Sequence, residues 1–264
     1  MAYHQYPSDA PEKSRGEVDR PLAIRFLEAV PAVCVLVLIA ARFGWLTADG
    51  AAASALVGVG IYGLTGIRGA EVLLGFFLTA TLLGRLSSRR HGPRNARQVL
   101  ANGGVALVSA VAWAAGARWC LLALPGSLAT ANADTWATEI GTRWGGPPRS
   151  LAWGRILPPH TSGGITRVGT LGGVAGALWI ALWWGAFPVL VGGVVGMFAD
   201  SLLGGTVQVR YRCAVCGTET EEGICACGGE TDLVRGVRWV DNDVVNLLAT
   251  AFGAALTVLV ARVR

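Results

Sequence analysis

Charged side chains are scarce in this sequence, and lysine is almost absent from it. Only 15% of the residues are charged, against roughly 25% in an ordinary soluble domain. Of the 22 basic residues, Lys13 is the one lysine, and the chain has three histidines. Hydrophobic residues make up 53% of the chain, and the mean hydropathy is +0.50. A soluble fold cannot bury that much apolar surface, and disordered or fibrous chains do not have this composition. The composition therefore indicates a multi-pass membrane protein.

The net charge of +5 comes from arginines that lie mostly in the gaps between apolar runs. This distribution is typical of positive loops beside a membrane. No basic stripe interleaved with aromatic residues is present, so we expect membrane lipids as partners and no nucleic acid.

The apolar runs predict an all-α fold. Residues 1–21 are polar and lack the apolar core of a signal peptide, which predicts a soluble tail. The apolar runs follow at Leu22–Phe43, Ala51–Gly66, Ala70–Leu86, Val99–Ala117, Trp119–Ala133, Val168–Gly185, Phe187–Gly205 and Val244–Val260. A spanning helix needs about 20 residues, so the runs beginning at Ala51 and Trp119 are short enough for half-helices or hairpins. We predict a transmembrane helical bundle over residues 22–264 with about seven to eight spans, some of them short or re-entrant.

Three polar, basic segments interrupt these runs: Arg85–Gln98, Gly141–Arg167 and Gln208–Asp243. Two apolar runs separate each segment from the next, so all three are expected on one face, which the positive-inside rule makes the cytoplasmic face. We expect the cell membrane as the location. Counting back through three spans puts the N-terminal tail outside, but a re-entrant early span would move it inside, so its side stays open.

The first cluster of polar residues stands where the fourth apolar run begins. It comprises Arg94, Asn95, Arg97, Gln98 and Asn102, and the three amides share one face of a helix by their spacing. One interpretation is a helix cap beside a positive loop. The other is an anion site at the membrane surface, where Arg97 neutralises a phosphate.

The densest cluster is Asn132, Asp134, Thr135, Thr138 and Glu139, which interrupts apolar sequence. Carboxylates at membrane depth are costly and usually functional. Because the cluster offers oxygen ligands without histidine or cysteine, it favours a hard cation such as magnesium. A structural buried pair and a proton relay are the alternatives.

Two further groups extend this pattern. Thr161, Ser162, Gly163 and Gly164 precede a predicted helix, where backbone N–H groups can hold an anion, although the spacing does not fit a P-loop. Asp200 and Ser201 repeat the Asp134–Thr135 pattern and suggest two walls of one site. Polar residues also occur nearby at Gln208 and around the start of the last run, at Asp241, Asn242, Asp243 and Asn246. Asp241 by itself is explained as a helix cap.

Four of the six cysteines lie within fifteen residues, as Cys213-x-x-Cys216 and Cys225-x-Cys227, each pair followed by glycine. This pattern resembles a zinc knuckle with four thiolate ligands. Disulfides are the alternative, which reducing conditions in the cytoplasm disfavour. With all four positions filled by sulfur, the zinc is expected to be structural, within a cytoplasmic loop over residues 208–240.

Taken together, RNARQVLANGG, ANADTWATEIG, TSGG, ADSLLGG and DNDVVNLLAT resemble the transmembrane protein 19-like family, a domain of unknown function that includes the plant phytyl-phosphate kinases. The resemblance runs from about Arg94 to the C-terminus. It implies a multi-pass helical enzyme that phosphorylates an isoprenoid monophosphate to the diphosphate with CTP or another nucleoside triphosphate. A looser similarity to polyprenol kinases and CDP-lipid cytidylyltransferases supports the nucleotide. This chain lacks the lysine that those families have between Gly145 and Ser162, where Arg149 or Arg155 would have to substitute.

The resemblance and the clusters lead to a set of expected roles. Asp134, Asp200, Glu139 and Asp243 are the expected catalytic carboxylates, with magnesium on Asp134, Asp200 and Asp243. Phosphate and nucleotide groups are expected at the Thr161–Gly164 turn, at Arg94, Arg97 or Arg155, and at the neighbouring polar residues Asn95, Gln98, Asn102, Asn132, Thr135, Ser201, Gln208, Asp241, Asn242 and Asn246. The lipid tail is expected between the glycine-rich helices.

Two other functions remain open at this stage. A cytidylyltransferase would use the same residues and release pyrophosphate. A transporter would use the carboxylates as ion or proton sites between repeated halves. A homodimer is also left open.

Overall fold

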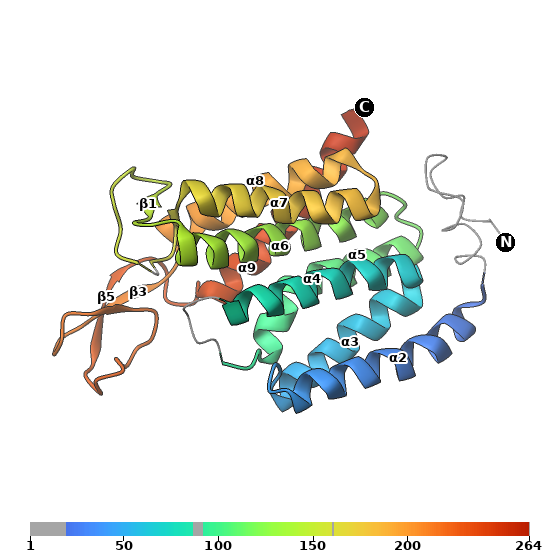
Figure 1. Ribbon diagram of the computed structural model, residues 1–264, viewed down its shortest axis with the longest axis horizontal. Helices are drawn as coiled ribbons and strands as arrows, with labels where there is room; N and C mark the ends of the chain where they lie inside the picture. The colour runs from blue at the N-terminus through green and yellow to red at the C-terminus, as the bar shows by residue number, and fades with distance from the viewer. Residues whose placement is uncertain (1–19, 87–91, 160, 264) are drawn as a thin grey trace.

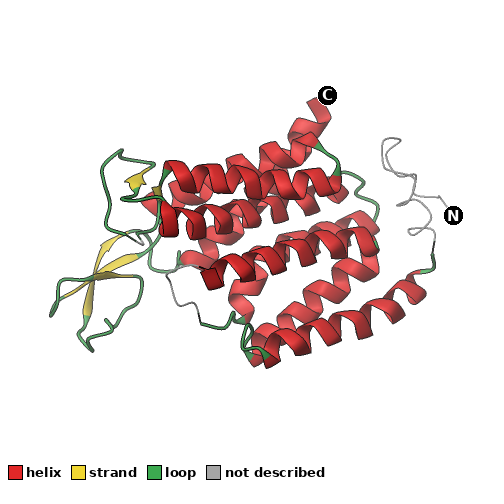
Figure 2. Ribbon diagram, viewed as in Figure 1, coloured by secondary structure: helices red, strands yellow, loops and turns green. Residues whose placement is uncertain are grey.

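The computed structural model describes residues 20–86, 92–159 and 161–263. Within them, eight helices pack side by side in a bundle (Figures 1 and 2). They are α2 (Leu22–Arg42), α3 (Ala48–Thr65), α4 (Ile67–Leu86), α5 (Ala96–Ala114), α6 (Cys120–Trp144), α7 (Arg167–Trp184), α8 (Phe187–Thr206) and α9 (Asn242–Val263). Five of these, α2, α3, α4, α8 and α9, are long and apolar enough to cross a membrane. The predicted all-α multi-pass membrane bundle is therefore confirmed.

Successive helices run in opposite directions, so the connections alternate between the two ends of the bundle. Gly66 alone joins α3 to α4, and Gly185 with Ala186 joins α7 to α8. The described parts of the three polar segments all lie at the opposite end from these two short links (Figure 1). α2 begins at the end that carries the short links, as expected if no early span is re-entrant. Residues 1–19 of the predicted tail lie outside the described residues.

Helix α6 is the central element, because it packs against α4, α5, α7, α8 and α9. The run at Trp119, short enough in sequence for a half-helix or a hairpin, forms neither, since α6 continues from Cys120 to Trp144. The polar residues after Ala133 continue the helix rather than ending it, because their side chains face the cavity described below and need no loop to keep them away from lipid.

The glycines of α7 and α8 serve close packing, as their spacing predicted. At Gly173 an added Cβ would lie 2.9 Å from the carbonyl oxygen of Ala133, and at Gly169 it would lie 2.7 Å from that of Ala137. Gly193 of α8 is equally close to Ala129. These faces are filled by α6 and by neighbouring helices. The expectation that a lipid tail lies between the glycine-rich helices is therefore wrong.

This packing predicts a selective cost for bulk on α7. Gly173→Ala should lower the stability of the detergent-solubilised protein by roughly 1–3 kcal/mol, because its methyl group enters space held by Met197 and Ala133. Gly104→Ala is the matched control, since its Cβ would meet nothing closer than 3.9 Å, at Leu100. Thermal unfolding followed by tryptophan fluorescence measures both. Equal stability of the two variants would contradict the packing argument.

Two small sheets lie beyond the polar end of the helices (Figure 2). β1 (Arg149–Ser150) pairs antiparallel with β2 (Gly164–Ile165) in the α6–α7 connection. β3 (Arg210–Cys213) lies between β4 (Glu219–Thr220) and β5 (Thr231–Arg235) in the α8–α9 connection, and both pairings are antiparallel.

Candidate functional site

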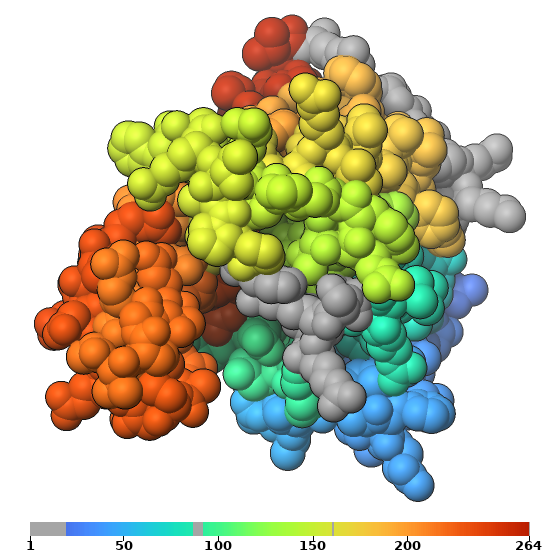
Figure 3. All heavy atoms as spheres, turned by 60° about the vertical axis from the view of Figure 1, so that its left-hand side comes forward, coloured from blue at the N-terminus to red at the C-terminus, as the bar shows by residue number. Residues whose placement is uncertain are grey.

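A cavity of about 920 Å³ opens at the polar end of the bundle. Figure 3 shows this end, which is hollowed between the α6–α7 connection and the cysteine-rich segment. Fifteen predicted site residues line the cavity: Arg94, Asn95, Gln98, Asn102, Asp134, Thr135, Glu139, Thr161, Ser162, Gly164, Asp200, Ser201, Gln208, Asn242 and Asn246. With the remaining lining residues, six helices (α4 to α9) and both large connections meet around one space. Six predicted residues lie outside its lining, namely Arg97, Asn132, Arg155, Gly163, Asp241 and Asp243.

Two carboxylates of neighbouring helices lie together in the lining of this cavity. Asp134 of α6 and Asp200 of α8 lie within hydrogen-bonding reach of one another, and Glu139 adds negative charge near Asp134. Oδ2 of Asp200 is buried without a hydrogen-bond partner. α6 and α8 run in the same direction and are packed together, which brings the two similar Asp-Thr/Ser motifs to the same depth.

This arrangement fits a hard divalent cation. Two half-buried acidic groups this close together repel unless a proton or a metal ion lies between them, and the buried, partnerless Oδ2 of Asp200 offers a free ligand atom. The donors are oxygens only, which suits magnesium.

Asn132 has a positioning role in the fold. It is fully buried, its Nδ2 donates to the carbonyl oxygen of Gly176 at 2.8 Å, and its Oδ1 accepts from the hydroxyl of Thr79 at 3.1 Å. These bonds tie α6 to α7 and α4, two residues before Asp134 on the same helix. Asn132 therefore holds the helix that carries Asp134 and does not face the cavity.

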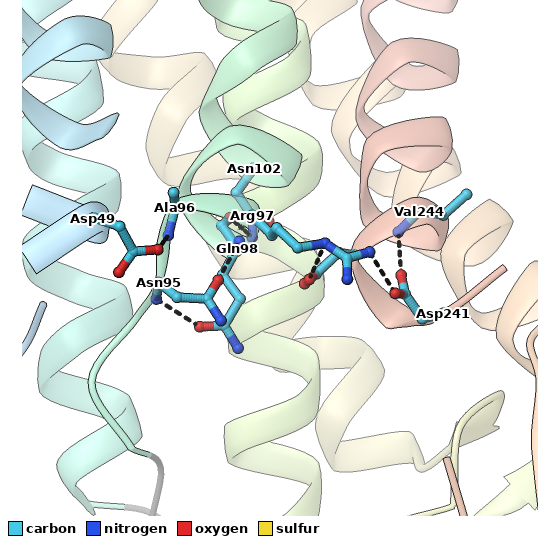
Figure 4. Close-up of polar contacts among 9 residues, drawn as sticks. Asp49, Asn95, Ala96, Arg97, Gln98, Asn102, Asp241 and Val244 are labelled. Atoms are coloured by element: carbon cyan, nitrogen blue, oxygen red, sulfur yellow. Dashed lines mark hydrogen bonds and ion pairs between the residues drawn. The ribbon is translucent and has the colours of Figure 1, made fainter. Parts of the chain in front are cut away.

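The amides at the start of α5 form a capping box, which confirms the cap interpretation of this cluster. The Asn95 side chain accepts from the backbone N–H of Gln98 at 3.1 Å, and the Gln98 side chain accepts from the N–H of Asn95 at 3.2 Å (Figure 4). Asp49 of α3 accepts from the N–H of Ala96 at 3.0 Å. Both amides line the cavity in addition to capping α5.

Arg97 points away from the cavity and bridges α5 to α9. Its guanidinium donates to Asp241 at 2.5 Å and lies 3.7 Å from Asp243 (Figure 4). Asp241 also caps α9, because it accepts from the N–H of Val244 at 3.1 Å. Arg97 thus pairs with Asp241 and Asp243 outside the lining of the cavity, whereas Asp134 and Asp200 lie within it.

Arg94 is the predicted arginine that does line the cavity. It is half-buried, donates to the hydroxyl of Thr81 at 3.2 Å and lies over the ring of Phe77. It is also near enough to Glu139 to interact with its charge. Arg155 is exposed. The lining of the cavity therefore holds a cation, Arg94, as well as the acidic groups.

The Thr161–Gly164 turn is held by its neighbours. Gly163 packs against Gly205 at the end of α8, and the N–H of Gly164 donates to Thr161 within the turn. The group that faces outward is the Ser162 hydroxyl, which donates to Glu221 at 2.6 Å and accepts from Gln208 at 3.3 Å.

The four cysteines form one cluster, in which their sulfur atoms all lie within 4.8 Å of one another. Cys213 Sγ lies 3.5 Å from Cys227 Sγ, and Cys216 Sγ lies 3.6 Å from the Sγ atoms of Cys225 and Cys227. Tetrahedral zinc with bonds of about 2.3 Å separates its sulfur ligands by about 3.8 Å, whereas a disulfide requires about 2.05 Å. The cluster could therefore hold a metal ion such as zinc.

Local contacts support that use of the thiols. Hydrogen bonds from the hydroxyl and backbone of Thr218 lower the pKa of Cys216 to about 6, which favours the thiolate that binds metal. Gly217 and Gly228, which follow the two cysteine pairs, have φ values of +70° and +81°. The chain can turn sharply there because glycine has no Cβ.

Two charged cavity residues were missed by the sequence reasoning. Glu221 follows β4 in the cysteine-rich segment, and Arg85 lies in the last turn of α4. Nothing in the local pattern distinguished Glu221 from its neighbours Glu219 and Glu222, because its position depends on how the sheet docks on the bundle. Arg85 was counted only as a loop charge.

The fold and the cavity define a class of protein: a polytopic helical membrane protein with a polar, carboxylate-bearing cavity at one end of its bundle. The chain belongs to the DUF92 family of integral membrane proteins, whose family model matches residues 31–254. The predicted family membership is thereby confirmed.

Its relatives span archaea and plants. An uncharacterised membrane protein of Methanocaldococcus jannaschii is 27% identical over 90% of this chain and 94% of its own length. Protein PGR of Arabidopsis thaliana is 26% identical over 75% of this chain and 83% of its own length. Protein VTE6, chloroplastic, from the same plant is 24% identical over 81% of this chain and 65% of its own length. No solved structure matches the chain.

Proposed function

We propose that this protein is a membrane-embedded kinase that transfers the γ-phosphoryl group of a nucleoside triphosphate, CTP by preference, to an isoprenoid monophosphate. The observation that carries the proposal is the Asp134–Asp200 pair in a polar cavity between membrane helices, with a partnerless oxygen on Asp200. The resemblance to phytyl-phosphate kinases supplies the substrate class, and the chain's similarity to Protein VTE6 of Arabidopsis agrees with it.

Each element of the site has a role in this reaction. Magnesium held by Asp134 and Asp200 would neutralise charge on the nucleotide phosphates. Arg94 and Arg85 add positive charge to the lining of the cavity, where phosphate oxygens would bind. Glu139, Thr135, Ser201, Asn242 and Asn246 offer further polar atoms to the bound groups.

The chemical step needs positioning more than proton transfer. An oxygen of the lipid monophosphate bonds to the γ-phosphorus as the bond from that phosphorus to the β,γ-bridging oxygen breaks. The nucleoside diphosphate leaves with the electron pair of that bond. Because the attacking oxygen is already anionic, no strong general base is required. The scarcity of histidine is consistent with this step.

The lipid tail is assigned to a second groove. It lies between α5 and α9, has a volume of about 600 Å³, and is lined mainly by apolar side chains such as Leu100, Val108 and Leu247. Its neighbours on the same two helices, Asn102 and Asn246, line the main cavity. An isoprenyl tail in the groove would therefore have its phosphate group near Asp134 and Asp200. At that level of the bundle a membrane lipid and a soluble nucleotide can meet.

This assignment predicts a selective effect of filling the groove. Gly104→Leu should raise KM for a long isoprenyl monophosphate about tenfold, a loss of roughly 1.4 kcal/mol of apolar contact. KM for the nucleotide should not change. Val111→Phe adds bulk to an exposed position of α5 outside the groove and is the control. An unchanged KM for the lipid in Gly104→Leu would mean that the isoprenyl tail does not bind in this groove.

The reaction itself is tested with purified protein in detergent, magnesium, labelled CTP and a panel of isoprenyl monophosphates. CDP appearing together with isoprenyl diphosphate establishes the kinase, and other nucleotides then test the preference for CTP. Formation of CDP-lipid and pyrophosphate would show that the protein is a cytidylyltransferase and not a kinase. Absence of turnover by folded, monodisperse protein, together with ion flux in liposomes, would show that the protein is a transporter and not a kinase.

The cell membrane, with the cavity facing the cytoplasm, is the proposed location. It follows from the arginine-rich connections at the cavity end of the bundle.

A further inference from the structure

The Ser162 hydroxyl is arranged to donate a hydrogen bond to an anion. Gln208 is 1% exposed, and its Nε2 donates to Ser162 Oγ at 3.3 Å. A hydroxyl has one proton to donate, and since Ser162 accepts from Gln208, that proton points to the carboxylate of Glu221 at 2.6 Å. The acceptor in this structure is thus a negatively charged group supplied by the cysteine-rich segment.

A buried cation stands behind the same carboxylate. Arg210 of β3 is 7% exposed, and its Nη2 lies 3.7 Å from Glu221. Its other carboxylate neighbour, Glu219, is 4.0 Å away. Nε and Nη2 of Arg210 have no hydrogen-bond partner. Burying guanidinium donors without partners is costly, so Glu221 and Glu219 satisfy Arg210 only in part.

An anion with more oxygens than a carboxylate would suit these donors better. A phosphate group has three or four acceptor oxygens, and it can accept from a hydroxyl and from a guanidinium at the same time. Glu221 lines the cavity, so its carboxylate stands where an anion entering the cavity would meet Ser162. Arg235 adds positive charge beside Arg210.

We propose that Ser162 and Arg210 form a phosphate-binding site that Glu221 occupies in this structure, and that a phosphate group binds by displacing Glu221. The ligand class is a phosphate ester or anhydride, from either the nucleotide or the lipid monophosphate. Naming the nucleotide and the lipid monophosphate as the two candidate ligands rests on the proposed function. The existence of the anion site does not. The cysteine-rich segment then has a second role besides folding, because it carries the carboxylate that competes with the ligand.

The test is equilibrium binding of CTP and, separately, of an isoprenyl monophosphate to the full-length protein without turnover, by calorimetry in detergent. Glu221→Gln should tighten the binding of one of the two ligands about tenfold, because it removes the competing anion. The ligand that responds identifies the source. Ser162→Ala should weaken that ligand about tenfold, and the double variant should lose the gain of Glu221→Gln.

A matched control separates displacement from a general change in charge. Glu222→Gln removes the exposed charge next to Glu221 in the sequence. It should change affinity less than threefold. Metal content and elution volume, unchanged from wild type, show that each variant is folded.

The outcomes distinguish this inference from the proposed function. Equal or weaker binding of both ligands by Glu221→Gln overturns the displaced-carboxylate site, even if the protein is an active kinase. Tighter binding that depends on Ser162 supports it, even if no lipid is turned over.

Discussion

Asp134→Asn and Asp200→Asn should each lower the rate of phosphoryl transfer by about 10³-fold, which corresponds to roughly 4 kcal/mol of transition-state stabilisation. Each variant replaces a charged ligand of the proposed magnesium with a neutral group of the same shape. Since Oδ2 of Asp200 has no hydrogen-bond partner to lose, Asp200→Asn should fold normally. Initial rates of isoprenyl diphosphate formation at saturating magnesium measure the effect.

Glu71→Gln is the control for this pair. Glu71 is an exposed carboxylate near the start of α4, at the opposite end of the bundle, where the indole N–H of Trp183 contacts it at 3.4 Å. Its activity should remain within about twofold of wild type, as is usual for a surface change far from a site. A near-normal rate in Asp134→Asn would remove the metal assignment, and a loss in Glu71→Gln would point to unfolding instead.

The second large effect is expected at the cysteine cluster. Purified protein should carry one zinc ion per chain, and Cys213→Ser should lower the zinc content to near zero. Structural zinc contributes roughly 10–16 kcal/mol of apparent binding free energy in small domains. Its loss should therefore unfold the sheet of β3, β4 and β5, which has little apolar core. Atomic absorption and limited proteolysis within residues 208–240 measure the two results.

The control here is Cys34→Ser, which changes an exposed cysteine of α2 that lies outside the cluster. Zinc content should be unchanged in that variant. Acid should release the metal, because protons compete for the thiolates. A zinc-free wild-type protein that retains protease resistance would contradict the metal site.

Much of the site was predictable because its residues are polar or charged and lie within apolar sequence. Asp134 and Asp200 are conspicuous in apolar helices, where a carboxylate without a role is costly. The same argument failed for Asp243 and Arg97, which neutralise each other in an ion pair at the ends of their helices. Local sequence does not distinguish a charge that faces a cavity from one that faces a partner charge.

The sequence alone determined the membrane-spanning helices, the common end of the polar connections and the four-cysteine cluster, because each depends on local hydropathy or close spacing. The tertiary structure decided which polar residues share the cavity. It extended α6 past Ala133, packed the glycines of α7 against α6 so that no lipid tail fits there, and brought Glu221 to Ser162. These features depend on which side chains meet after the helices pack, and that packing joins residues distant in the chain through contacts that no local pattern encodes.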